Sequence, residues 1–181
     1  FNRGVGGHPL GDLAARWQED VIDLRPDVLS VFVGTNDAER HLGRLLRADD
    51  PKTVPDFDFA DWERTYRGLL DQARQANPAL KIVLCTPFAA PCGKIVEGAL
   101  GEYYPLRQRI LAQCCVIVER IAADYGATLV PFHRLIADLE TRLPNGDATY
   151  WVWDGIHPTP AGQRLMADCW IGAAARSGVM E

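Results

Sequence analysis

Residues 27–37 read DVLSVFVGTND, and this stretch decides the fold. The residues from 28 to 33 are dominated by apolar and β-branched side chains, which is typical of a parallel strand buried on both faces. Gly34 ends the run, and polar residues follow at once. We therefore predict a central strand with a polar segment, GTND, at its carboxyl end.

The same pattern returns twice along the chain. Runs that begin at Lys81 (KIVLCTP) and Ala127 (ATLVPF) each follow a stretch with apolar residues at helical spacing, at 59–73 and 106–121. A first amphipathic helix is expected over 10–24, and a last one begins after His157 with Thr159 as N-cap and Pro160 at its first position. Strands alternating with helices predict an α/β fold with a doubly wound parallel sheet, covered on both faces.

Composition excludes several classes of protein. The chain has 181 residues, 48% of them hydrophobic, and a net charge of −5, so we expect a single domain, 1–181, with no basic stripe for nucleic acid. No apolar run approaches the roughly 20 residues of a membrane span. The five cysteines form no CxxC pair, which favours buried thiols in a reducing, cytoplasmic compartment over a zinc site or disulfides. The chain begins with Phe1 instead of Met, so we expect the natural N-terminus to lie upstream, which leaves secretion open as an alternative.

Three segments are expected at the carboxyl edge of the sheet, where ligands bind in folds of this class. They are NRGVGGH at 2–8, GTND at 34–37 and DGIH at 154–157. The longest irregular stretches, roughly 48–58 and 89–100, are expected to extend from the same edge. We predict that they form the walls of a substrate pocket.

His157 and Asp154, three residues apart, have the spacing of a general base and the acid that orients it. Ester cleavage by a serine needs a neutral imidazole to accept the hydroxyl proton and a carboxylate that holds the ring in the right tautomer. The alternative is that Asp154, which precedes a glycine, only shapes a turn. A metal site built from Asp154, His157 and His8 is disfavoured because nothing in the sequence defines its geometry.

Gly7 and Asn36 are candidates for an oxyanion hole. A glycine backbone N–H and an asparagine side-chain amide are donors that can be held in place before an acyl transfer begins. The alternative is that Gly7 only shapes a turn and that Asn36 only caps the following helix. Three polar segments at one edge favour the functional interpretation.

The motifs NRGVGGH, GTND and DGIHPT, in this order, resemble the second, third and fifth sequence blocks of the SGNH (GDSL-type) hydrolase superfamily. The similarity extends from Asn2 to about Trp170, and DLAARWQEDVIDLRPDVLSVFVGTND looks most like the acetylxylan-esterase-like and related carbohydrate acetylesterase branch. The resemblance implies a flavodoxin-like three-layer α/β/α fold and hydrolysis of acyl esters with no cofactor and no metal. It assigns Gly7 and Asn36 to the oxyanion hole, Asp154 to the triad acid and His157 to the base.

The chain departs from this family at the nucleophile. The first block, a Gly-Asp-Ser turn after the first strand, is absent, so we expect this domain to lack its N-terminal nucleophile strand and to be poorly stable and inactive alone. Ser30 and Ser177 are the only serines. Ser30 lies too far along the strand from Asn36, and Ser177 is expected in an exposed C-terminal tail. Cys85 is the better substitute, although a cysteine in an apolar strand is usually core.

The sequence thus predicts a serine esterase that acts on short acyl esters, chiefly acetyl groups on carbohydrates, with its serine upstream of Phe1. The alternative is a non-catalytic binding or scaffold domain of the same fold that has lost the nucleophile. Trp151 and Trp153 either stack on a sugar ring or form the packed wall of the site. An exposed strand edge would also allow pairing into a homo-oligomer.

Overall fold

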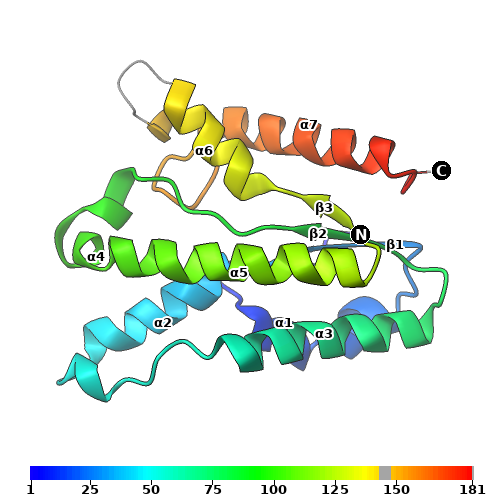
Figure 1. Ribbon diagram of the computed structural model, residues 1–181, viewed down its shortest axis with the longest axis horizontal. Coiled ribbons are helices and arrows are strands. Elements are labelled where there is room, and N and C mark those ends of the chain that lie inside the picture. Colours follow the sequence, from blue (N-terminus) through cyan, green and yellow to red (C-terminus); the bar gives the residue numbers. More distant parts are fainter. Residues whose placement is uncertain (143–147, 181) are drawn as a thin grey trace.

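The computed structural model describes residues 1–142 and 148–180, and three parallel strands form the sheet in this part of the chain. Strand β1 spans Val28–Phe32, β2 spans Lys81–Cys85 and β3 spans Thr128–Val130. Their order is β1-β2-β3, with Val28 opposite Lys81 and Val83 opposite Thr128 (Figure 1). The predicted α/β fold with a parallel sheet is confirmed.

Helices connect and cover these strands. Their bounds are α1 Leu10–Ala15, α2 Thr35–Arg47, α3 Phe59–Ala76, α4 Gly98–Glu102, α5 Tyr104–Asp124, α6 Phe132–Arg142 and α7 Pro160–Arg176. A π-helical segment at Gln18–Ile22 follows α1, and short 3-10 turns lie at Pro51–Thr53, Gly93–Val96 and Ala148–Tyr150. Helix α7 begins as predicted, because the Thr159 hydroxyl accepts a hydrogen bond from the Gly162 N–H and Pro160 stands at the first position.

The sheet separates two hydrophobic cores, which gives the three layers of a flavodoxin-like fold. Alternate residues of β2 point to opposite faces, so Ile82 and Leu84 join one core while Val83 and Cys85 join the other. The first core contains residues of α1, α3 and α5, and the second contains residues of α6 and α7. Figure 1 shows these two groups of helices on opposite sides of the strands.

Three details differ from the sequence predictions. Strand β1 is not buried on both faces: Leu29 and Val31 are buried, but Val28, Ser30 and Phe32 are exposed, since in the described part of the chain β1 pairs with β2 alone. The first helix is not continuous to residue 24, because the backbone at Arg16 leaves helical geometry before the π-helical segment. Helix α6 was not predicted.

Candidate active site

Asp154 and His157 meet in a tight turn just before α7. The Nδ1 atom of His157 lies 2.9 Å from Oδ2 of Asp154. The other carboxylate oxygen accepts hydrogen bonds from the backbone N–H groups of Ile156, at 3.1 Å, and His157, at 2.9 Å. Asp154 is 2% exposed, whereas the His157 side chain is 60% exposed. The carboxylate is therefore hidden behind an imidazole that faces solvent.

The surroundings of Asp154 keep it ionised. Burial alone raises the pKa of its carboxyl group, but the hydrogen bonds from the His157 ring, the His157 N–H and the Ile156 N–H lower it more, so the pKa lies below its ordinary value. The Lys94 ammonium is 3.5 Å from the same Oδ2 atom. Because that side chain is 60% exposed, the contact contributes little energy. An ionised Asp154 favours the His157 tautomer with hydrogen on Nδ1, which leaves Nε2 free to accept a proton.

Close backbone packing holds this turn in place. Gly155 has φ +92°, and a Cβ there would stand 2.4 Å from the Ile95 side chain. Gly93 has φ +63°, and a Cβ there would stand 2.6 Å from Cα of Asp154. The turn is also closed by the Trp153 N–H, which donates to the His157 carbonyl at 3.1 Å. Both glycines are needed because the 93–96 turn packs directly on the 154–157 turn.

Gly7 and Asn36 lie on the segment that leads into α1 and on the first turn of α2. Gly7 is exposed with φ +81°, a conformation that favours glycine. The Asn36 side-chain amide donates to the carbonyl of His8 at 3.4 Å, a long bond that draws the two segments together. An amide carries a second hydrogen, so Asn36 can donate to a ligand from the same position.

Asp37 has a structural role that the sequence analysis did not assign. Its Oδ1 atom accepts hydrogen bonds from the Leu10 N–H and from the Trp62 indole, both at 3.0 Å. Burial raises the pKa of Asp37, and these hydrogen bonds offset part of the increase. Asn36 and Asp37 thus both bind the 8–10 segment. In the sequence, the only sign of this role of Asp37 was its position in the GTND motif.

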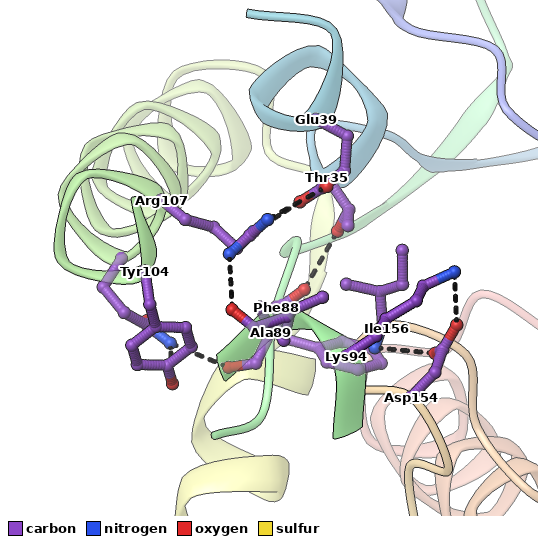
Figure 2. A network of polar contacts seen from close by, with 11 residues as sticks. Thr35, Glu39, Phe88, Ala89, Lys94, Tyr104, Arg107, Asp154 and Ile156 are labelled. Carbon is purple, nitrogen blue, oxygen red and sulfur yellow. Dashed lines mark hydrogen bonds and ion pairs between the residues drawn. The ribbon is translucent and has the colours of Figure 1, made fainter. Parts of the chain in front are cut away.

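The segment 86–92, between β2 and the 93–96 turn, contacts both α2 and the turn that carries Asp154. The Thr35 hydroxyl donates to the carbonyl of Phe88 at 3.0 Å, and the Ala90 N–H donates to the carbonyl of Gly155 at 2.8 Å. Figure 2 shows the contact between Thr35 and Phe88 and, close to it, the contacts of Lys94 and Ile156 with Asp154. The predicted pocket wall at 89–100 is therefore also the link between the oxyanion candidates and the triad candidates.

The aromatic and histidine neighbours differ from one another in exposure. Trp151 is half-buried and belongs to the core under α7, so it is part of the packed wall. Trp153 is 58% exposed and stacks on the His157 ring, with ring centroids 5.9 Å apart. His8 is half-buried beside the oxyanion segment and His41 is buried in α2. Within the described residues, no group of three His, Cys, Asp or Glu side chains is placed to hold a metal ion.

The possible substitute nucleophiles are all engaged elsewhere. The hydroxyl of Ser30 accepts a hydrogen bond from the Trp170 indole at 3.0 Å, and that of Ser177 is 2.7 Å from the Thr128 hydroxyl. Cys85 is 2% exposed, and burial raises the pKa of its thiol to about 12. A thiol with that pKa is almost fully protonated near neutral pH, so Cys85 is a poor candidate for a nucleophile.

No helix in the described ranges is long and apolar enough to cross a membrane.

Known proteins are similar to this chain in sequence and in fold. An acetylxylan esterase from Geobacillus stearothermophilus is 32% identical over 173 residues, which cover 94% of this chain and 69% of that protein. Among solved structures, a putative GDSL-like lipase from Parabacteroides merdae has a TM-score of 0.79 at 28% identity, over 99% of this chain and 72% of that one.

The acetylxylan esterase Axe2 from Geobacillus stearothermophilus has a TM-score of 0.74 at 26% identity, over 95% of this chain and 70% of that one. A catalytic mutant of Axe2 with serine replaced by alanine has a TM-score of 0.72 at 26% identity, over the same shares of the two chains. The sequence profile of the GDSL-like lipase/acylhydrolase family matches residues 1–165. With nearly its whole length matched in sequence and in fold, this chain belongs to the GDSL-like lipase/acylhydrolase family.

Proposed function

We propose that this protein is a serine ester hydrolase in which His157 is the general base, Asp154 orients it, and Gly7 and Asn36 bind the oxyanion. The single observation that carries the proposal is the 2.9 Å contact between Nδ1 of His157, whose side chain is 60% exposed, and the buried Asp154 carboxylate. A structural turn alone would not need an ionised acid beneath an exposed imidazole. This is the arrangement that proton transfer from a hydroxyl requires.

The reaction proceeds in two halves. A serine hydroxyl attacks the ester carbonyl while Nε2 of His157 accepts its proton, and Asp154 stabilises the imidazolium that results. The negative charge that forms on the carbonyl oxygen is held by the Gly7 N–H and the Asn36 amide. His157 then gives its proton to the departing alcohol. Water repeats the sequence on the acyl-enzyme and releases the acid.

The serine is proposed to come from a strand and a Gly-Asp-Ser turn that precede Phe1 in the protein. The exposed face of β1 supports this proposal, because Val28 and Phe32 are large apolar residues that a further strand and its helix would cover. The Axe2 mutant supports it as well, since a catalytic residue of that relative is a serine.

Acetyl esters of carbohydrates are the proposed substrates. The sequence relative and the solved relative Axe2 are both acetylxylan esterases, which supports a short acyl group on a sugar. The exposed Trp153 ring beside His157 is compatible with a sugar ring in this position, because an indole face packs well on the C–H face of a sugar.

One observation favours a second candidate, a non-catalytic binding domain with the same fold. The two serines of the 181 residues both bind other side chains, at 3.0 Å and 2.7 Å, away from the His157 turn. Reading the coding region upstream of Phe1 separates the two candidates. A predicted strand followed by Gly-Asp-Ser supports the esterase, and any other sequence supports the binding domain.

The activity test uses the full-length gene product and p-nitrophenyl acetate. We expect hydrolysis by the native protein and a loss of turnover of about 10⁴-fold or more in His157→Ala, as for other triads. His133→Gln is the matched control, because that histidine lies on α6 with its ring 2.8 Å from the Thr86 hydroxyl. Equal turnover in native protein and His157→Ala would remove the mechanism.

A further inference from the structure

Arg107 on α5 is a charged side chain with no exposure to solvent at all. It is 0% exposed, and its guanidinium reaches two other parts of the chain. Its Nε and Nη2 atoms bind the two carboxylate oxygens of Glu39 on α2, the latter at 3.1 Å. Its Nη1 atom donates to the carbonyl of Ile95, also at 3.1 Å. Figure 2 shows this guanidinium between α2 and the loop beside Asp154.

Both partners of Arg107 lead directly to the proposed catalytic groups. Glu39 follows Asn36 by three residues, so the two lie about one turn apart on α2. Ile95 lies in the 93–96 turn, and its side chain fills the space that a Cβ of Gly155 would need. A shift of the Ile95 backbone would therefore be transmitted to the turn that carries Asp154.

Stability alone is a weak reason for this arrangement. The Arg107 side chain is fully buried and that of Glu39 is 23% exposed, so the ion pair carries a desolvation cost, and a well-packed apolar pair of similar volume is often as stable or more so. A planar guanidinium does what an apolar side chain cannot: it fixes a carboxylate on one side and a backbone carbonyl on another in one defined geometry. The contacts of Arg107 are those of a clamp between two segments.

We propose that Arg107 is a positioning residue for the ester hydrolysis: it fixes the spacing between the Asn36 oxyanion donor and the Asp154–His157 pair by holding α2 against the 93–96 turn. The inference rests on the proposed function of these groups. Arg107 would act through Glu39 and Ile95 and not as a catalytic residue, because its side chain is fully buried and its N–H groups bind those two residues. Misplacing a catalytic group by about 1 Å can cost 10²-fold in rate, so a clamp of this kind has a measurable effect.

The first test is kinetic and uses the full-length protein with p-nitrophenyl acetate. We expect Arg107→Met to lower kcat by about 10- to 100-fold with little change in KM, because the ground state does not need the spacing that the transition state needs. Arg107→Lys should recover part of the loss, since an ammonium can satisfy one partner but not both. All rates are taken at least 15 °C below the Tm of each variant.

The matched control is Arg67→Met. Arg67 on α3 also binds two partners, with Nε 2.8 Å from Glu63 and Nη2 2.7 Å from Asp124, but neither partner contacts the site. We expect this variant to keep the native kcat. If Arg107→Met does not fold, Glu39→Gln is the second variant, because it keeps the shape of the acceptor and removes its charge. Its kcat should lie between that of the native protein and that of Arg107→Lys.

The second test is spectroscopic and does not depend on turnover. We expect the proton on Nδ1 of His157, which is held by Asp154, to give a downfield resonance in the native protein. This resonance should shift or broaden in Arg107→Met and Arg107→Lys but not in Arg67→Met. Native kcat together with an unchanged resonance in the folded Arg107 variants would overturn the inference. A native protein with no hydrolysis would instead defeat the proposed function, and the resonance alone would then decide whether Arg107 positions the pair.

Discussion

His157 and Asp154 divide the two requirements of a base-and-acid pair between an exposed and a buried side chain. The 2.9 Å contact joins an imidazole that is 60% exposed to a carboxylate that is 2% exposed. The ring can meet a substrate, while the acid is shielded and receives two further backbone hydrogen bonds. This arrangement makes the orientation of the His157 ring a property of the fold.

Asn36→Ala should lower kcat of the full-length protein by about 10²- to 10³-fold, because one oxyanion donor is lost and the charge in the transition state is less stabilised. KM should change little. The control is Asn77→Ala, because Asn77 directly follows the C-terminal end of α3, donates to the Pro26 carbonyl and should affect stability alone. Steady-state kinetics on p-nitrophenyl acetate measures both, and an equal loss in the two variants would argue against the oxyanion role.

Asp154 should contribute stability that depends on pH. Its pKa in the folded protein lies below the ordinary value of 3.8, so ionisation favours the folded state above that pH. The contribution is lost as the pH falls from about 3.8 through the lowered folded pKa. Thermal unfolding of native protein and Asp154→Asn should therefore show a Tm difference that is full at pH 6 and shrinks below pH 4. A difference that grows on acidification would contradict the sign.

Cys85 should be inert in the folded protein, because the thiol is buried and its pKa is raised to about 12. Iodoacetamide at pH 8 should leave it unmodified until the protein unfolds, as mass spectrometry of the modified peptides would show. Cys85→Ala should keep the native kcat and lose about 1 kcal/mol of stability, typical of a core substitution. Rapid modification of Cys85 in native protein would reopen its candidacy as a nucleophile.

Gly93→Ala should be more damaging than Gly98→Ala. Both glycines have positive φ, +63° and +50°, so each substitution carries strain of about 1–2 kcal/mol. Only at Gly93 does the new Cβ collide with the Asp154 backbone, at 2.6 Å, whereas nothing lies within 4 Å of a Cβ at Gly98. The clash should add about 1–3 kcal/mol and displace the Asp154 backbone, and with it the carboxylate that holds His157. Denaturant unfolding and steady-state kinetics compare the free energy of unfolding and kcat of the two variants. Equal losses in both variants would mean that the 93–96 turn shifts without cost to make room for the Cβ.

Much of the fold was predictable because local signals agreed with it. The apolar runs at Val28, Lys81 and Ala127 became the three parallel strands, and Thr159 with Pro160 began the last helix as expected. The error at β1 came from reading six residues in isolation. The apolar side chains of this strand favour burial on both faces. Whether each face is covered depends on the other strands and helices of the fold.

The site divides in the same way. The amino-acid sequence alone pointed to His157, Asp154, Asn36 and Gly7, because residue type and spacing in short segments carry that chemistry. Only the tertiary structure showed that Arg107 and Ile95 stand between them, since their contacts join α2, α5 and the 93–96 turn from positions that are 12 to 68 residues apart. Local sequence determines which groups can react, whereas the distances between those groups are decided by packing among segments that are remote along the chain, and no short-range pattern encodes them.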